Sequence, residues 1–389
     1  MRSRWSPILV APAFVLAFVA PQQKGCAKKS ASTAPVDLTL QQAVDQTAKD
    51  LSKQLAPSSD TRTLVVDPFV DRSSKQATHA SQRVEEALKP AIATTLHNMT
   101  VVPGDRTSGQ DARFVLTGTL ASEGGLFVLR TALSDRQSTL VVAQSAVRFR
   151  DGTLDGSPTK IVEDSPAIAS SDAASSGRVA TAETPRGRPA DTLYLDQLKT
   201  SLVIAEGDAA YNAGRWDAAL AAYTVAVGRP DGQSLTAFNG LYLSNVKLGR
   251  MAAAEEAFGK LATLGLAKNS LAVKLLFKPS SATEFWDASA TAVYSMWARQ
   301  IARATRAANA CLNIVGHTSH SGSESINQRL SLQRAETVKR MLEGEVRDLA
   351  AKVTATGIGF SENIIGTGTD DARDAVDRRV EFKVVPCRF

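Results

Sequence analysis

The residue whose type and position most clearly point to chemistry is Arg334. It lies on a helical stripe whose other members are apolar: Leu330, Val338 and either Met341 or Leu342. A guanidinium in such a row needs a partner, because an unpaired buried charge is expensive. The planar fork of arginine matches a carboxylate. Arg334 therefore either binds a carboxylate ligand or forms an internal salt bridge, for example with Glu324 or Asp377.

Other residue types that support chemistry occur in weaker patterns. His317 and His320 stand close together, but a metal site needs three or four ligands and no third one lies nearby in the sequence. The glycine-containing run at 366–371 lacks the lysine of a phosphate loop. We find no nucleophile elbow, dinucleotide fingerprint or converging acid–base set. We therefore expect no metal, no cofactor and no enzymatic activity.

Two cysteines, Cys311 and Cys387, fall in the C-terminal part of the chain. In an oxidising compartment they can form a disulfide. The alternative is two separate, half-buried thiols.

The elements that position Arg334 are predicted to follow the order strand, helix, strand, helix, strand, strand. Long helical patterns follow the first and second strands. This order predicts one α+β domain over residues 271–389. Its strands are indicated at 272–279, 310–319, 352–359 and 378–385.

This order, together with four short motifs, resembles the OmpA-like C-terminal domain family. The motifs are GHT (316–318), NQRLSLQRA (327–335), GIG (357–359) and DRRVEFKV (377–384). The resemblance implies non-covalent binding of peptidoglycan, with Arg334 on the free carboxylate of diaminopimelate in the stem peptide. It makes the expected binding residues Thr318, Ser319, Asn327, Leu330, Arg334 and Arg379.

One position departs from the family pattern. The family commonly has an aspartate directly after GHT, where it receives the ammonium group of the ligand, and this chain has Ser319. A hydroxyl accepts a hydrogen bond but carries no charge, and a charge-assisted bond is roughly twice as strong. Two hypotheses follow: a domain that binds peptidoglycan, and an interaction domain that binds it weakly or not at all.

Residues 192–270 are predicted to be entirely helical and contain an internal repeat. Residues 207–227 align with 241–261. Small residues at matched positions allow close helix approach, and matched aromatic rings fill the remaining space. The pattern resembles tetratricopeptide repeats, which implies a protein partner; the alternative is a generic helical hairpin. The matched pairs are Ala219 with Ala254 and Tyr223 with Phe258.

Residues 38–152 are predicted to form an α/β domain. A helix leads to the strand segment VVDPFVD (65–71), and a second helix and a short strand lead to a strand meander that includes FVLTGTL (114–120). This layout resembles the envelope domains of the FlgO, LpoB and CsgG group of lipoproteins. The resemblance implies a protein-interaction module.

The remaining segments are predicted to be targeting or connecting sequence. Residues 1–26 combine an arginine-containing start with an apolar run too short to cross a bilayer, which is typical of a signal peptide. Cys26 is a lipidation candidate, in which case the signal is of the lipoprotein type. Residues 27–37 form a polar tether. Residues 153–191 contain few large apolar side chains, so a flexible linker is expected.

The composition agrees with a multidomain protein. The chain has 389 residues, 43% of them hydrophobic, and a net charge of +6 that is not concentrated in one tract. The absence of a basic stripe with interleaved aromatic residues argues against nucleic-acid binding. The combined hypothesis is a scaffold exported to the periplasm of a Gram-negative bacterium. Its expected partners are peptidoglycan, an unidentified envelope protein and, if Cys26 carries lipid, the outer membrane.

Overall fold

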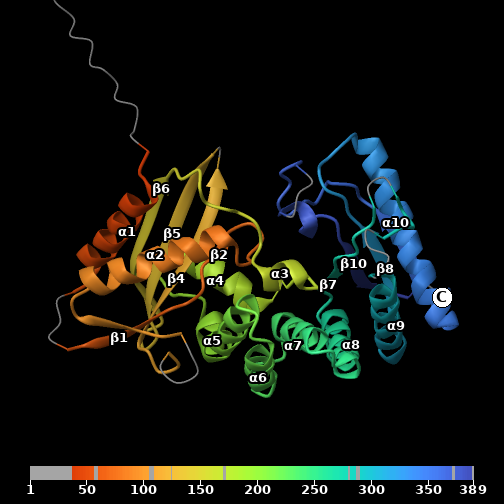
Figure 1. Ribbon diagram of the computed structural model, residues 1–389, viewed down its shortest axis with the longest axis horizontal. Coiled ribbons are helices and arrows are strands. Elements are labelled where there is room, and N and C mark those ends of the chain that lie inside the picture. The colour runs from red at the N-terminus through yellow and green to blue at the C-terminus, as the bar shows by residue number, and fades with distance from the viewer. Residues whose placement is uncertain are drawn as a thin grey trace, which may run out of the picture. The chain divides into compact units, whose positions relative to one another are not determined.

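The computed structural model describes most of the chain from Asp37 onward (Figure 1). The predicted signal peptide, Cys26 and the predicted tether up to residue 36 lie outside the described residues. No helix in the described part combines the length and apolar character that crossing a bilayer requires. The described residues are 37–56, 60–104, 109–123, 125–169, 172–278, 281–285, 290–369 and 373–387.

A mixed β-sheet forms the centre of the N-terminal region. Its strands are β1 (Arg62–Val66), β2 (Val70–Asp71), β3 (Met99–Val102), β4 (Phe114–Glu123), β5 (Leu126–Asp135) and β6 (Leu140–Phe149). The order is β3-β1-β4-β5-β6, and the short β2 also pairs with β4. β1 runs parallel to β3 and β4, whereas β4, β5 and β6 form an antiparallel meander. The elements follow the order expected from the sequence.

Two helices, α1 (Leu40–Gln54) and α2 (His79–Thr95), cover one face of this sheet (Figure 1). Each begins with a capping box in which a threonine, Thr39 or Thr78, accepts a hydrogen bond from the backbone three residues later. Their apolar stripes pack on the sheet, and this burial holds the helices in place. The buried stripe residues include Val44, Ala48, Leu51, Val84, Leu88 and Ile92.

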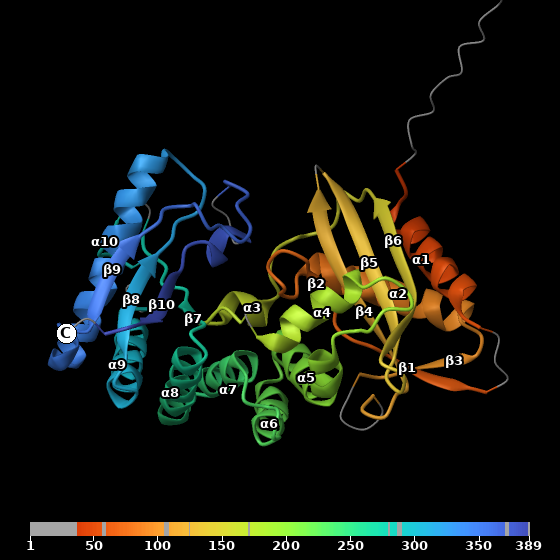
Figure 2. The ribbon, with the colours of Figure 1, turned by 180° about the vertical axis from the view of Figure 1, so that it is seen from behind.

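The opposite face of the sheet is covered by α4 (Ala173–Glu183) and the first half of α5 (Thr192–Asn212) (Figure 2). Neighbouring residues in a strand point to opposite faces. Leu64 accordingly packs with α1 and α2, whereas Val65 packs against α5. The sheet is therefore the middle of three layers.

The prediction of a flexible linker over residues 153–191 is wrong where it covers α3 (Lys160–Asp164) and α4. α4 is attached by a buried ion pair, in which Arg178 Nε lies 2.5 Å from an oxygen of Asp67. It also lies very close to α5, because a Cβ on Gly177 would come within 2.7 Å of the Tyr194 Cβ. The small residues that suggested disorder instead permit this close packing, and a polar contact compensates for the small apolar area.

Four helices form two consecutive helical hairpins. α5 pairs with α6 (Trp216–Val227), and α7 (Leu235–Lys247) pairs with α8 (Met251–Ala267). The matched residues Ala219, Ala254, Tyr223 and Phe258 are all fully buried, as the repeat predicts. Gly240 lies so close to the Tyr223 ring that a Cβ there would come within 2.3 Å of it. Helical pairs are therefore present at the expected positions, and their kinship with tetratricopeptide repeats stays a prediction.

The C-terminal region is an α+β domain with a four-stranded sheet. Its elements are β7 (Leu271–Val273), α9 (Ala290–Ala307), β8 (Cys311–Gly316), α10 (Glu324–Glu345), β9 (Val353–Gly357) and β10 (Val380–Val385), with short 3-10 turns at Arg347–Leu349 and Arg373–Val376. The sheet order is β7-β10-β8-β9, and β8 and β9 are parallel. The order strand, helix, strand, helix, strand, strand is the one expected.

The helical hairpins and the C-terminal domain share one hydrophobic core, so residue 270 is not a boundary between separate cores. Phe258 of α8 stacks on Trp297 of α9 with ring centroids 5.3 Å apart. The Trp297 indole donates a hydrogen bond of 3.0 Å to the Tyr242 hydroxyl of α7. This contact joins aromatic side chains from both regions.

The segment after α3 covers the edge of the C-terminal sheet. Ile168 N donates to the Ala272 carbonyl of β7 at 2.9 Å, and Lys274 N donates to the Pro166 carbonyl at 2.8 Å. The Lys274 ammonium donates to the carbonyls of Val162 and Glu163, at the end of α3. Burial lowers the pKa of Lys274 to about 8. The segment that was predicted to be a flexible linker thus contacts both the N-terminal and the C-terminal sheet.

Cys311 and Cys387 form a disulfide. It joins the first residue of β8 to the segment just after β10, two strands that pair along their length. Of the two alternatives that the sequence left open, the structure contains the covalent bond.

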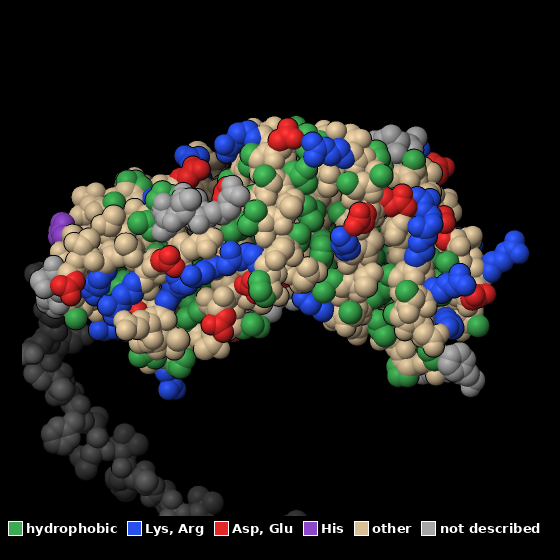
Figure 3. Space-filling model, turned by 90° about the horizontal axis from the view of Figure 1, so that it is seen from below, with side chains coloured by type: hydrophobic (Ala, Val, Ile, Leu, Met, Phe, Trp, Pro, Cys, Tyr) green, Lys and Arg blue, Asp and Glu red, His purple; other side chains and the backbone are tan. Residues whose placement is uncertain are grey.

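Basic and acidic side chains are mixed on the face of the molecule that Figure 3 shows. In Figure 3, lysine and arginine side chains lie in several separate groups with acidic side chains beside them. On the face shown, no continuous basic tract is present, in agreement with the charge pattern of the sequence.

Candidate functional site

Arg334 lies in the middle of α10 and is buried, with 7% of its surface exposed. Its Nε donates to the Ser281 carbonyl at 3.1 Å and its Nη2 to the Lys278 carbonyl at 3.3 Å. The guanidinium carbon lies 5.1 Å from the centre of the Phe277 ring. Arg334 therefore holds the segment that precedes α9 against α10.

The internal salt bridges considered for Arg334 are absent from the described residues. Glu324 is exposed in the first turn of α10. The Asp377 carboxylate accepts backbone hydrogen bonds from Ile364, Ile365 and Gly366 at 2.5–3.2 Å. Asp377 thus organises the loop after β9 and is not the partner of Arg334.

The loop after β8 carries Thr318 and Ser319, and both side chains are buried. Thr318 N donates to the Gly359 carbonyl at 2.9 Å, which ties this loop to the one after β9. The Thr318 hydroxyl is buried and has no hydrogen-bond partner among the described residues. The Ser319 hydroxyl lies 3.4 Å from that of Ser321. Neutral hydroxyls therefore occupy the position where the family pattern has a carboxylate.

Asn327 and Ser331 of α10 fix the two loops. The Asn327 amide donates to the Ser321 carbonyl at 2.6 Å and to the Ser323 carbonyl at 3.2 Å. The Ser331 hydroxyl accepts a hydrogen bond from Gly359 N at 2.9 Å. Asn327 was expected to bind ligand, and the structure shows it bound to the loop that carries Ser321. Ser331 was not singled out from the sequence, although it lies inside the NQRLSLQRA motif.

Two glycines allow α10 to lie directly on the sheet. A Cβ on Gly316 would come within 2.1 Å of the Ser331 carbonyl oxygen, and one on Gly357 within 2.2 Å of Leu332 N. Any larger residue at either position would push α10, and with it Arg334, away from the strands. The glycines of the GHT and GIG motifs thus have a physical role.

Arg379 lies beneath these loops and is almost fully buried. Its Nε donates to Glu381 at 2.7 Å, and its Nη2 donates to the Glu362 carbonyl at 3.2 Å. Burial acts to raise the pKa of Glu381, but the hydrogen bond from Lys383 and the charge of Arg379 outweigh burial and lower it. Arg379 was expected to contact ligand, and its observed contacts hold β10 and the loop after β9.

His317 is enclosed beside this charged group. Its Nε2 lies 3.5 Å from Glu381 Oε1, and neither ring nitrogen makes a hydrogen bond to the described residues. Burial, with the charge of Arg379, lowers the pKa of His317 to about 4. His320, by contrast, is exposed and packs edge-on against Phe360. Within the described ranges, no three His, Cys, Asp or Glu residues are grouped as metal ligands.

The structure brings the expected binding residues to one side of α10. Thr318, Ser319 and Asn327 lie at its N-terminal end, and Arg334 follows Asn327 by about two helical turns. Leu330 lies between them and is partly buried. Only Arg379 is set apart, beneath the loops.

Comparison with known proteins places the C-terminal region in a family. Residues 276–377 match the model of the OmpA family. Over 75 residues the chain is 40% identical to outer membrane porin F of Pseudomonas fluorescens, a match that covers 19% of this chain and 22% of the relative. Over 79 residues it is 38% identical to outer membrane protein A of Shimwellia blattae, covering 18% and 32%. The chain thus spans between 22% and 32% of these two curated relatives.

Two solved structures are similar to parts of the chain. One is the peptidoglycan-associated lipoprotein from Burkholderia pseudomallei, with 23% identity, coverage of 29% of this chain and 89% of that chain, and a TM-score of 0.24. The other is the LpoB C-terminal domain from Escherichia coli, with 15% identity, coverage of 28% and 98%, and a TM-score of 0.22. The C-terminal domain thus contains an OmpA-family segment at residues 276–377, which includes α9, β8, α10 and β9.

Proposed function

We propose that the chain is a non-enzymatic scaffold of the bacterial cell envelope that binds peptidoglycan non-covalently through its OmpA-like domain. The observation that carries the proposal is the OmpA-family match over residues 276–377, which includes Arg334 and the two loops beside it. Two relatives of this segment are, by name, outer-membrane proteins, which supports an envelope location.

In this proposal, Arg334 receives the free carboxylate of diaminopimelate in the stem peptide. Thr318, Ser319, Asn327 and Leu330 form the rest of the binding surface at the N-terminal end of α10. Arg379 acts as a positioning residue, because its observed hydrogen bonds hold the loop after β9. A guanidinium–carboxylate contact of this kind is worth about 1.5–3 kcal/mol.

Sedimentation with purified sacculi tests the proposal. The whole exported chain is used, because the C-terminal domain shares its core with the helical hairpins. We expect wild type to sediment with sacculi and Arg334→Ala to bind roughly tenfold to a hundredfold more weakly. Arg340→Ala is the matched control, because Arg340 is exposed on the same helix. Circular dichroism checks that each variant is folded. Wild type that stays in the supernatant would show that the proposal is wrong.

The second candidate function is an envelope interaction module whose OmpA-like domain binds peptidoglycan weakly or not at all. The neutral hydroxyl of Ser319, which is buried beside Ser321, favours it. Under this hypothesis Ser319→Asp should strongly increase binding to sacculi, because it adds the charge that an ammonium group requires. Unchanged binding in this variant would contradict both the ligand model and the second candidate.

The helical hairpins and the N-terminal domain recruit, in this proposal, an unidentified envelope protein. The chain is exported to the periplasm of a Gram-negative bacterium by residues 1–26 and is anchored to the outer membrane if Cys26 is lipidated. The disulfide between Cys311 and Cys387 supports an oxidising compartment. Mass spectrometry of the mature N-terminus tests both points, since it shows where the chain is cleaved and whether Cys26 carries lipid.

A further inference from the structure

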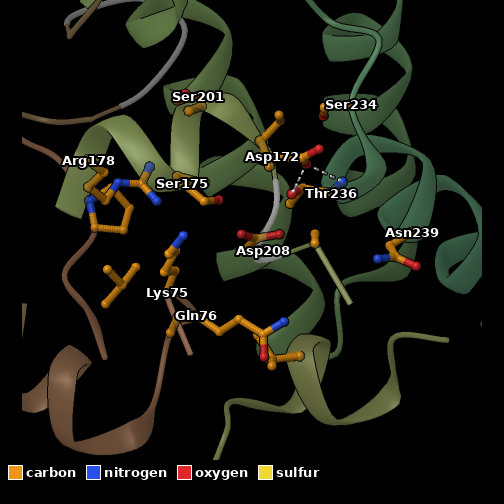
Figure 4. A pocket seen from close by; sticks show the side chains of 18 of the residues that line it. Lys75, Gln76, Asp172, Ser175, Arg178, Ser201, Asp208, Ser234, Thr236 and Asn239 are labelled. Carbon is orange, nitrogen blue, oxygen red and sulfur yellow. Dashed lines mark hydrogen bonds between the residues drawn. The ribbon is translucent and has the colours of Figure 1, made fainter. Parts of the chain in front are cut away.

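A cavity of about 140 Å³ lies where the turn after β2 meets α3, α4, α5 and α7 (Figure 4). Its lining residues differ from those of the candidate peptidoglycan site. Apolar side chains such as Val70, Ile161 and Ile204 form part of its wall. A cavity of this size in another protein holds a six-carbon ring, so there is room for a small molecule.

An acidic side chain, Asp208 of α5, lines this cavity. Among the described residues, its carboxylate accepts one side-chain hydrogen bond, from the Tyr223 hydroxyl at 2.7 Å. It forms no salt bridge to the described residues. Burial raises the pKa of Asp208 to about 6, although the Tyr223 hydrogen bond and the charge of Arg178 act in the opposite direction. A carboxylate has room for several donors, so Asp208 retains acceptor capacity toward the cavity.

A basic side chain, Lys75, lines the same cavity. Lys75, in the turn after β2, donates to the Ser176 hydroxyl at 3.0 Å and forms no salt bridge within the described part of the chain. Its backbone has φ +58°, which is uncommon for a residue other than glycine. Asp71 holds this conformation, because its carbonyl accepts from Lys75 N and its carboxylate accepts from Ser74 N. Figure 4 shows Lys75 and Asp208 at the pocket.

Other charged groups at the cavity are bound by protein. Arg178 is paired with Asp67. Asp172 accepts from the backbone and the hydroxyl of Thr236, at 3.1 and 2.9 Å, and so caps the start of α7 (Figure 4). Asp231 lies 3.8 Å from Arg229, and the Lys268 ammonium donates to the Gln233 carbonyl at 3.4 Å. This leaves Lys75 and Asp208 as a cation and an anion whose side chains neither form a salt bridge nor bind a backbone group among the described residues.

Neutral polar groups without protein partners also line the cavity. Ser201 is 7% exposed, and its hydroxyl makes no hydrogen bond to the described residues. The side chains of Ser175 and Gln76 likewise have no hydrogen-bond partner in the described part. These side chains therefore keep hydrogen-bonding capacity for an occupant that can donate and accept hydrogen bonds.

We propose that this cavity binds a compact zwitterion of amino-acid size, with its ammonium group on Asp208 and its carboxylate on Lys75. A ligand with one charge of each sign provides a countercharge for both side chains at once. Ser201, Ser175 and Gln76 provide further hydrogen bonds. A ligand with only an amine or only an acid leaves one of the two charges without a partner.

Isothermal titration calorimetry with the whole exported chain at pH 7.5 tests the proposal. The zwitterionic probes are glycine and both enantiomers of alanine, serine and glutamine, and the single-charge probes are propionate and propylamine. We expect at least one zwitterion to give a saturable heat and to raise the melting temperature. The single-charge probes should give neither at the same concentration. If no zwitterion binds at millimolar concentration, the cavity holds water only and the proposal is wrong.

Variants of the two charged residues test the assigned contacts. Asp208→Asn and Lys75→Met should each weaken binding of the zwitterion by at least about tenfold. Asp217→Asn is the control, because Asp217 is exposed on the neighbouring α6 and does not line the cavity. Affinity should also decline as the pH falls through about 6, where Asp208 takes up a proton. If Asp208→Asn does not fold, Lys75→Met decides, since unchanged affinity in that variant contradicts the assignment.

Discussion

Several buried polar residues of the C-terminal domain hold the loops around Arg334. Asp377 is fully buried and binds three successive backbone N–H groups of the loop after β9. Asp374 accepts from the backbone and the hydroxyl of Thr367 in the same loop. Charge-assisted hydrogen bonds to backbone donors are strong, so these two carboxylates restrict the loop to one conformation.

The residue His317 should make stability depend on pH. Its pKa is about 4 in the folded protein and 6.5 in its reference state. The stability that the neutral ring contributes is complete above 6.5 and is lost as the pH falls toward 4. Between pH 7 and pH 4.5 we expect wild type to lose about 2 kcal/mol more unfolding free energy than His317→Gln.

Urea unfolding of both proteins at the two pH values measures this difference. The groups that face His317 are Arg379, Glu381 and Lys383, and they are unchanged in the variant. His97→Gln is the control, because His97 is exposed and should show the pH dependence of wild type. An equal loss in wild type and in His317→Gln would contradict the prediction.

At the scale of elements, α4 shows how a helix without large apolar residues is held in place. Gly177 permits close approach to Tyr194, and the ion pair between Arg178 and Asp67 lies beneath the helix. The Tyr194 hydroxyl donates to the same Asp67 carboxylate at 2.7 Å. A buried charge is tolerated here because the network supplies both an ion pair and a hydrogen bond.

Removal of Arg178 should therefore destabilise the protein strongly. Arg178→Ala leaves Asp67 as a buried charge without its cation, which typically costs about 3–5 kcal/mol. Urea unfolding measures the change, and hydrogen exchange shows whether α4 loses protection. Arg186→Ala is the matched control, because Arg186 is exposed just beyond α4. Equal stability of the two variants would mean that the ion pair does not hold α4.

At the scale of the whole molecule, α5 links two regions that the sequence predicts to be separate domains. Its first half packs on the N-terminal sheet, and its second half forms the first helical hairpin. The hairpins in turn share their core with the C-terminal domain. Contacts therefore continue from the N-terminal sheet to the OmpA-like domain without an intervening flexible linker among the described residues.

The disulfide should contribute to the stability of the C-terminal domain. It joins residues 76 apart in sequence. A crosslink that closes a loop of this length lowers the entropy of the unfolded chain and so stabilises the folded state by about 4.5 kcal/mol. We expect the double variant Cys311→Ser, Cys387→Ser to unfold at lower urea concentration than oxidised wild type. Wild type treated with a reductant should match the double variant. Unfolding that is insensitive to the reductant would contradict the prediction.

Local sequence patterns determined which elements form and in what order. The helix predicted before the VVDPFVD strand is α1, and the matched small and aromatic residues Ala219 and Tyr223 mark the packing surface of α6. The stripe through Arg334 and the GHT and GIG motifs located the candidate site on α10 and two loops. These features can be predicted from the sequence because helix and strand periodicity relates residues that are only a few positions apart.

Only the tertiary structure decided which distant residues meet. Asp67 and Arg178 are 111 positions apart, and their contact ordered a segment whose composition suggested a linker. The carbonyls bound by Arg334, the choice between disulfide and thiols, and the cavity between Lys75 and Asp208 depend in the same way on long-range packing. The physical reason is that one buried polar contact can offset the chain entropy of a small-residue segment, and its partner is not marked in the local sequence.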